Sequence, residues 1–233
     1  MSDLQTGIQA LDRQLGGGFA SGNLVALVTP PDAPSTRVLH QLMRQRSTTY
    51  LTTLRPGVDV ETELVRLGNG TADVSIEEIG ELKKTNKMLH NLTDSAIYSA
   101  NTTDRERVLD EVNEIIDTID GSQNVIVDPM NPLETSESKT AYQRLLRKMS
   151  AKLREENGLG ILHCISSDEP PALRDRTLTM VDTVWNLEIG SDNEGNLELK
   201  TTIPKNRGGE VIFEKHTLIL DRKTVRTDIS RSI

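Results

Sequence analysis

The chain has 233 residues, a net charge of −8 and a hydrophobic fraction of 35%, a balance typical of a folded α/β protein and not of a disordered one. The acidic pI near 5.1 argues against broad binding to duplex DNA, and no apolar run reaches the roughly 20 residues that a membrane helix needs. Without a signal peptide pattern at the N-terminus, and with Cys164 as the single cysteine, we expect a cytoplasmic protein without an internal disulfide.

Strand-like and helix-like patterns alternate along the chain, as a parallel sheet with crossover helices requires. In the first half, we expect a strand at 24–28, a helix from Ser35, a strand at 49–54, a helix at 60–67 that ends at Gly68, a lysine-rich helix at 76–89 and a strand at 96–98. In the second half, we expect a helix capped by Asp104 with Val108, Val112, Ile115 and Ile119 on one face, a strand at 124–127 that ends at Asp128, a helix at 138–157 stopped by Gly158, and a strand at 159–165.

Beyond residue 165 the helical patterns end, and three strands joined by turns are expected at 181–189, 197–203 and 211–220. No repeat, low-complexity segment or flexible linker divides the chain. The sequence therefore predicts a single α/β domain over residues 1–233, in which a mostly parallel sheet is flanked by helices and extended by antiparallel strands at its C-terminal end.

The segment from Thr6 to Val28 resembles the KaiC/RadA branch of the RecA superfamily. The run Thr-Gly-Ile-Gln-Ala-Leu-Asp at 6–12, followed by Leu-Gly-Gly-Gly at 15–18, matches the approach that precedes the Walker A loop in that branch. The resemblance implies a RecA-like P-loop NTPase core. It also suggests an archaeal source, and the scarcity of aromatic residues, at 3%, favours a salt-adapted cytoplasm such as that of a haloarchaeon.

The loop aligned with Walker A lacks the groups that bind phosphate. A working loop has the pattern G-x-x-x-x-G-K-[ST], in which backbone N–H groups and a lysine hold the phosphates. The aligned residues 29–36 contain neither glycine nor lysine: Pro34 replaces the second glycine, Ser35 replaces the lysine, and Asp32 adds a negative charge. Because unit charges about 4 Å apart interact by roughly 1 to 4 kcal/mol near a surface, we expect weak nucleotide binding at best. Thr36 retains the hydroxyl position that binds Mg²⁺ in the family.

Two further positions bear on ATP chemistry. In KaiC-like relatives a pair of glutamates at the end of the second strand activates water, and the aligned residues here are Leu54 and Arg55, neither of which can act as a base. Asp128, at the end of a buried strand, occupies the Walker B position. An alternative role for Asp128, before Pro129, is to organise the turn. We therefore assign no catalytic residue and no metal site, and treat Thr36 and Asp128 as vestigial nucleotide-binding residues.

The resemblance also implies a basic pair that acts between subunits. KaiC-like proteins carry a K-x-R pair near the C-terminus that reaches the nucleotide of an adjacent protomer, and Lys205 and Arg207 match it. Such a cation can serve a partner's site even when its own site is empty. The alternative is a solvated hairpin that happens to carry two basic residues.

These observations favour a non-catalytic protein that associates with itself or with an active RecA-family paralogue, through an apolar surface at residues 6–12 together with Lys205 and Arg207. The association would serve signalling, regulation or support of DNA recombination and repair, with no cofactor. One alternative is an atypical ATP-binding switch that uses Thr36, Asp128 and Arg37 or Arg55 with Mg²⁺. A third hypothesis, a DNA-binding accessory protein, is disfavoured by the net charge.

Overall fold

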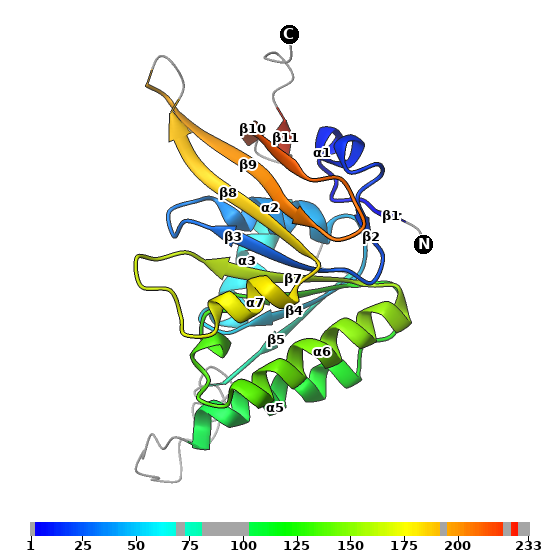
Figure 1. The fold of residues 1–233 in the computed structure, drawn as a ribbon, viewed down its shortest axis with the longest axis vertical. Helices are drawn as coiled ribbons and strands as arrows, with labels where there is room; N and C mark the ends of the chain where they lie inside the picture. Colours follow the sequence, from blue (N-terminus) through cyan, green and yellow to red (C-terminus); the bar gives the residue numbers. More distant parts are fainter. Residues whose placement is uncertain (1–2, 69–72, 81–102, 192–194, 221–224, 228–233) are drawn as a thin grey trace.

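The computed structural model describes residues 3–68, 73–80, 103–191, 195–220 and 225–227, and a large twisted sheet runs through its centre (Figure 1). The strands are β1 (Asp3–Leu4), β2 (Phe19–Ala20), β3 (Leu24–Thr29), β4 (Thr48–Thr52), β5 (Val74–Glu78), β6 (Asn124–Asp128), β7 (Leu159–Ile165), β8 (Thr183–Ser191), β9 (Leu197–Asn206), β10 (Ile212–Leu220) and β11 (Val225–Thr227). The helices are α1 (Gln9–Gln14), α2 (Ser35–Met43), α3 (Gly57–Arg66), α5 (Thr103–Asp117), the 3₁₀ turn η2 (Leu133–Thr135), α6 (Lys139–Glu156) and α7 (Arg174–Met180).

The main sheet has nine strands in the order β11-β10-β9-β8-β3-β7-β6-β4-β5, while β1 and β2 form a separate small pair. The strands from β8 to β5 run parallel to one another, and the strands from β8 to β11 pair antiparallel. This is the α/β architecture expected from the sequence, a mostly parallel sheet with an antiparallel C-terminal extension.

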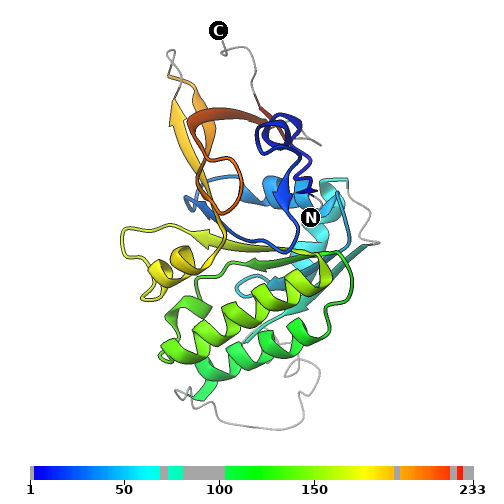
Figure 2. The ribbon, with the colours of Figure 1, turned by 45° about the vertical axis from the view of Figure 1, so that its right-hand side comes forward.

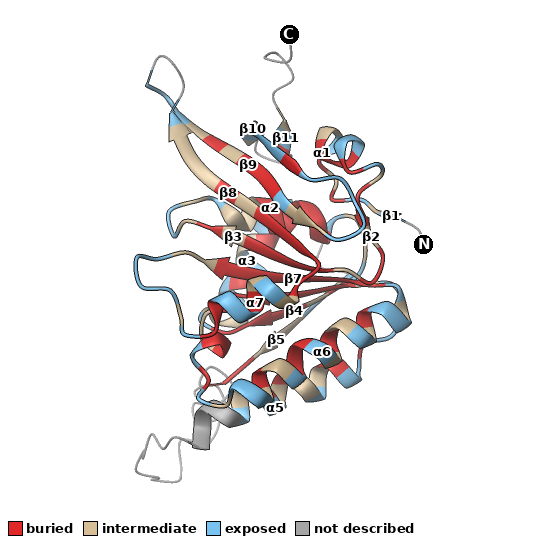
Figure 3. Ribbon diagram, in the orientation of Figure 1, coloured by how far each residue is buried: buried red, intermediate tan, exposed pale blue. Residues whose placement is uncertain are grey.

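Alternation along the central strands divides the core into two layers, because successive side chains of a strand point to opposite faces. Val25 and Leu27 belong to the first core cluster, which α1, α2 and α3 cover, whereas Leu24 and Ala26 belong to the second, under α5 and α6. The two latter helices lie side by side on one face (Figure 2). Figure 3 shows that the middle strands are buried along most of their length, which explains their nearly continuous apolar sequences.

Several predicted elements are confirmed with small shifts in their ends. Helix α6 starts after Ser138, whose side chain accepts the backbone N–H of Ala141 at 3.2 Å, as in an ordinary N-cap. Its left-handed end residue is Asn157, with φ 55°, and not Gly158. Of the face predicted for the helix at α5, Val112 and Ile119 are buried, whereas Val108 and Ile115 are only partly buried. Leu109 and Ile116 are buried as well, because adjacent registers of a helix share one apolar face. Asp104, the predicted cap, lies within α5.

Two predictions were wrong. Residues 74–78 form strand β5 where the sequence favoured a helix from Ile76, because pairing with the buried strand β4 outweighs a polar composition. Residues 79 and 80 are not helical either, and residues 81–89 of the predicted helix and the predicted strand at 96–98 lie outside the described residues. Helix α7 was not expected at all, and it links β7 to β8 as the crossover that two parallel strands of the same sheet require.

Candidate functional site

A row of four polar side chains crosses the carboxyl end of the parallel sheet. Thr29, His163, Asp128 and Tyr50 come from β3, β7, β6 and β4, which are neighbours in that order. The Thr29 hydroxyl lies 2.8 Å from Nε2 of His163, and Nδ1 of His163 lies 2.5 Å from Oδ1 of Asp128. The Tyr50 hydroxyl donates to Oδ2 of Asp128. We call these four residues the polar row.

Strand register brings the polar row together. Asp128 ends β6 one residue beyond Val127, which pairs with Leu162, so Asp128 lies level with His163. Tyr50 pairs with Ile126, and its long side chain reaches along the strand to Asp128. All four residues project from the face that α2 and α3 cover, in phase with the apolar residues Val25, Leu27, Ile126 and Ile161 of the first core cluster.

Burial and mutual contact determine the protonation states in the polar row. The four residues are between 1% and 7% exposed. Burial alone would raise the pKa of Asp128, but the hydrogen bonds and charge of His163 and Tyr50 outweigh it and lower this pKa. Burial, followed by the neighbouring Asp128 charge, raises the pKa of Tyr50 well above its usual value. Asp128 is therefore a carboxylate that accepts hydrogen bonds from the Tyr50 hydroxyl and from Nδ1–H of His163, while Nε2 of His163 is hydrogen-bonded to the Thr29 hydroxyl.

The loop aligned with Walker A folds onto itself. The N–H of Ala33 donates to the Pro30 carbonyl at 3.1 Å, and the N–H of Ser35 donates to the Ala33 carbonyl at 2.7 Å. Ala33 packs against the first core cluster, so part of this loop is directed into the protein. Thr36 is half-buried in the first turn of α2. The polar row thus connects Asp128, through His163, to Thr29 at the start of this loop. Thr36 does not belong to the polar row.

The predicted base position also lies near this end of the sheet. Arg55 forms an ion pair with Glu63 of α3, while Leu54 is 58% exposed. Neither side chain can take a proton from water at neutral pH.

Lys205 and Arg207 lie at the opposite edge of the sheet. At this edge, the start of β8 pairs with the end of β9, so that Thr183 lies opposite Asn206. Thr183 also pairs with Val25, near the start of β3. Lys205 Nζ donates to the carbonyls of Leu178 and Thr179 at 2.7 and 3.0 Å, at the C-terminal end of α7. A guanidinium N–H of Arg207 donates to the Thr179 carbonyl at 2.9 Å. The structure therefore brings Lys205 and Arg207 together at the amino ends of the parallel strands, whereas Asp128 ends β6 at its carboxyl end.

A third basic residue joins this pair. Arg154, from the C-terminal part of α6, lies 3.3 Å from Oδ1 of Asp182, and Arg207 lies 3.8 Å from the same oxygen. The Asp182 side chain is 8% exposed, and its other oxygen accepts the backbone N–H of Leu24 at 3.0 Å. Desolvation, together with the charge of Arg207, lowers the pKa of Lys205. We call Arg154, Lys205 and Arg207 the basic cluster; Arg154 had not been singled out from the sequence.

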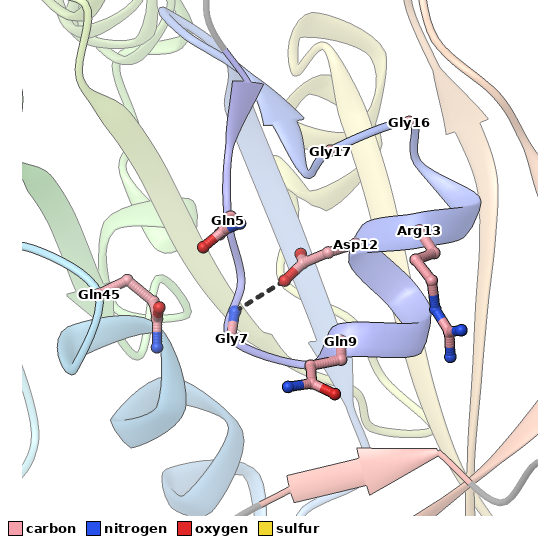
Figure 4. Close-up of a pocket in the computed structure, with 8 residues that line it drawn as sticks. All are labelled: Gln5, Gly7, Gln9, Asp12, Arg13, Gly16, Gly17 and Gln45. Atoms are coloured by element: carbon pink, nitrogen blue, oxygen red, sulfur yellow. Dashed lines mark hydrogen bonds between the residues drawn. The ribbon is translucent and has the colours of Figure 1, made fainter.

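The segment that carries the family resemblance borders an open groove at the same amino edge (Figure 4). The groove has a volume of about 780 Å³ and is lined by Gln5, Gly7, Gln9, Asp12, Arg13, Gly16, Gly17 and Gln45. Asp12 accepts the backbone N–H groups of Thr6 and Gly7 at 2.8 and 3.1 Å, which shapes the turn. The apolar residues of the segment, Ile8 and Leu11, are buried in the first core cluster. The expected apolar contact surface is therefore absent from residues 6–12, because its side chains complete the core.

Glu134 and its partners form a second buried group of polar side chains, which connects η2 to α7. Glu134 of η2, which is fully buried, pairs with Arg174 of α7 at 2.7 Å and accepts the Thr177 hydroxyl. Cys164 is also fully buried near Glu134, and burial followed by that charge raises the pKa of its thiol above the usual range. Cys164 thus belongs to the second core cluster, on the face opposite to His163.

Comparison with known proteins places the chain in a family. Residues 3–233 match the model of DUF7125, which is described as a family of unknown function. The chain belongs to this family. Among solved structures, the crystal structure of the KaiC-like protein PH0186 from the hyperthermophilic archaeon Pyrococcus horikoshii OT3 matches with a TM-score of 0.65 and 15% identity, over 97% of this chain and 98% of that one. At this identity the match shows a shared fold, a RecA-like α/β core. No curated protein matches the chain.

Two kinds of feature are absent from the described residues, a membrane-spanning helix and a cluster of metal ligands. No helix in that part of the DUF7125 chain is long and apolar enough to cross a membrane. No group of three or more His, Cys, Asp or Glu side chains in the described ranges could hold a metal ion.

Proposed function

We propose that this DUF7125 protein is a non-catalytic member of the RecA superfamily that acts by associating with itself or with an active paralogue, in signalling, regulation or DNA repair. The observation that carries the proposal is the hydrogen bonding of the Asp128 carboxylate. Both of its carboxylate oxygens accept hydrogen bonds, from His163 and from Tyr50. The position at which a RecA-type ATPase presents a carboxylate to Mg²⁺ is here part of a buried network.

The surrounding residues do not fit a magnesium nucleotide. Pro34 has no N–H to offer, and the N–H groups of Ala33 and Ser35 donate to carbonyls of their own loop. Asp32 is exposed on this loop and would repel a triphosphate. We therefore propose no reaction step that involves ATP or Mg²⁺, and we expect neither to be a cofactor.

Titration calorimetry with Mg-ATP tests the non-catalytic part. We expect no binding with a dissociation constant below about 1 mM, an affinity that corresponds to roughly 4 kcal/mol. The variants Asp32→Gly and Asp32→Gly/Ser35→Lys provide a matched comparison, because the first removes the negative charge and the second also restores the lysine, while Pro34 still stands at the position of the second glycine. Micromolar binding by the wild-type protein, lost in Thr36→Ala, would instead establish the atypical ATP-binding switch.

Association with an active paralogue is tested through the basic cluster. In a confirmed complex with a RecA-family ATPase, Arg207→Ala should lower the partner's rate of ATP hydrolysis, because the guanidinium would act on the partner's nucleotide. Arg176→Ala, an exposed arginine of α7, is the control. If the two variants leave hydrolysis equally unchanged, the trans-acting role of Arg207 is wrong.

A further inference from the structure

Helices α5 and α6 form a layer over the second core cluster and run in the same direction (Figure 2). Lys148 Nζ of α6 donates to the Asn113 carbonyl of α5 at 3.0 Å and to Asp117 at 2.7 Å. Just beyond α5, the N–H of Gly121 donates to Glu156 at 2.9 Å. Residues of α5 and α6 that are 31 to 35 positions apart in the sequence are therefore level with each other.

The outward face of α5 carries two exposed carboxylates. Asp110 and Glu114 are four residues apart, so they lie on one face of the helix, opposite to the buried Val112 and Ile116. Neither carboxylate forms a hydrogen bond or an ion pair within the described part of the chain. Like charges at this spacing are unfavourable within a helix, so the stability of α5 does not explain them. We call Asp110 and Glu114 the acidic stripe.

The outward face of α6 carries charges of the opposite sign. Arg144 and Arg147 are exposed and lie three residues apart on one side of the helix. Neither guanidinium has a hydrogen-bond or ion-pair partner among the described residues, whereas Lys148 and Lys152 of the same helix form ion pairs. Ala151, which is also exposed on this face, is small and leaves room for close approach. We call Arg144 and Arg147 the basic stripe.

From this arrangement we infer that two copies of the chain associate through their α5–α6 layers, with the acidic stripe of each copy against the basic stripe of the other. A two-fold axis that runs along the helices, in the plane of contact, places α5 over α6 in both directions and keeps every residue at its own height. Asp110 then faces Arg144, and Glu114 faces Arg147, because both pairs have the sequence separation of level residues. A two-fold axis across the helices would bring like charges together.

The expected dimer is weak. Helix α6 has 18 residues and is thus about 27 Å long, and two adjacent helices are about 20 Å wide, so the contact would bury about 1,000 Å² in total. The exposed residues Arg107 and Glu155, near the two ends of the layer, interrupt the charge pattern and confine the attraction to its middle. We therefore expect a micromolar dissociation constant. The inference rests on the proposed function, because it names a second copy as the partner and the α5–α6 layer as the surface.

Sedimentation velocity with charge-reversed variants tests the inference. The wild-type protein should form dimers as its concentration rises, and association should be roughly tenfold weaker at about 0.5 M salt because exposed charges are screened. The variants Asp110→Lys/Glu114→Lys and Arg144→Glu/Arg147→Glu should each remain monomeric, since each makes the layer uniform in charge. An equimolar mixture of the two should form a heterodimer. Asp59→Lys/Glu61→Lys is the control, because these exposed carboxylates lie on α3, on the other face of the sheet, and it should dimerise like wild type.

Disulfide crosslinking tests the register without charge reversal. A mixture of Glu114→Cys and Arg147→Cys chains should crosslink under mild oxidation, whereas neither variant alone should, because equivalent residues of the two copies do not face each other. The native Cys164 is buried and should not react.

Circular dichroism melts establish that each variant is folded. A wild-type protein that stays monomeric at all concentrations would overturn the inference, as would folded charge variants that fail to complement, or crosslinking by Glu114→Cys alone. A monomer that still binds an active RecA-family ATPase would contradict this inference and leave the proposed function intact. Micromolar Mg-ATP binding by a protein that dimerises as described would contradict the proposed function alone.

Discussion

At the scale of single residues, the polar row shows how a buried carboxylate can be kept charged without a metal or a lysine. Asp128 is 7% exposed, and its pKa is lowered because two donors compensate for its desolvation. Hydrogen bonds to a charged group are worth more than neutral ones, and an unpaired buried charge is costly. The polar row should therefore contribute to stability whatever its present function.

Replacing His163 by Ala removes a hydrogen-bond donor to Asp128 and the partner of the Thr29 hydroxyl. We expect a loss of about 2 to 3 kcal/mol in the free energy of unfolding, the range for hydrogen bonds to charged groups. Urea denaturation measures it. His216→Ala is the control, because that side chain forms one exposed contact with Gln14, and its effect should stay within about 0.5 kcal/mol. Equal effects of the two substitutions would contradict a stabilising polar row.

The lowered pKa of Asp128 has a consequence for pH dependence. A carboxyl group with a pKa that is lower in the folded state stabilises the protein above its unfolded pKa, near 3.9, and loses this contribution as pH falls through the folded pKa. The stability advantage of wild type over Asp128→Asn should thus be constant from pH 7 to pH 5 and shrink below about pH 4. Denaturation curves at several pH values measure it, and an advantage that grows in acid would show that the sign is wrong.

At the scale of elements, close packing between α6 and the sheet requires a residue without a side chain at Gly160. A Cβ atom there would lie 2.5 Å from Leu153 Cδ1 and 2.6 Å from Leu24 Cδ1, and both leucines are buried. The backbone of Gly160 has no left-handed conformation, so the restriction is one of space and not of backbone torsion. Here the helix lies against β3 and β7, which carry two members of the polar row.

Gly160→Ala should therefore destabilise the protein by about 1 to 3 kcal/mol through overpacking. Thermal melting measures the effect. The double variant Gly160→Ala/Leu153→Ala should recover part of the space and lose less than the sum of its single variants, because the two positions share one contact. Strict additivity would contradict the packing account.

At the scale of the whole molecule, segments from the N-terminal and C-terminal parts of the chain pack against each other. β11 pairs with β10 at the edge of the nine-stranded sheet and also contacts α1 and α2. Val225 is 3% exposed in the first core cluster, the same cluster that contains Ile8 and Leu11. The N-terminal segment with the family resemblance is thus held in place partly by the C-terminal end of the chain.

Val225→Ala should cost about 1.5 to 3 kcal/mol, because two buried methyl groups are removed and a small cavity remains. Chemical denaturation measures this. Ile219→Ala on the neighbouring strand, 41% exposed, should cost less than 1 kcal/mol. If the two losses are equal, β11 does not complete the core in the way described.

The order of strands, and so the polar row, could not be predicted from the sequence. His163 is visible at the end of an apolar run, but only as a lone histidine, and Thr29 and Tyr50 are ordinary strand residues. Likewise β7, α7, β8 and most of β9 separate Arg154 from Lys205 and Arg207 in the sequence, and Arg154 and Arg207 meet only at Asp182. Helix α7 and strand β5 were missed because both are short and polar, and because the contacts that stabilise them come from distant parts of the sequence.

Local patterns were sufficient to predict the alternation of strands and helices and to show the resemblance at residues 6–28 and the absence of glycine and lysine from residues 29–36. These features depend on side-chain periodicity and on residue identity at short spacing, which a single chain displays directly. The tertiary structure decided which polar groups meet, because hydrogen bonds across neighbouring strands depend on strand order and register. It thus joined Asp128 to His163, and it placed the basic cluster at the opposite edge of the sheet.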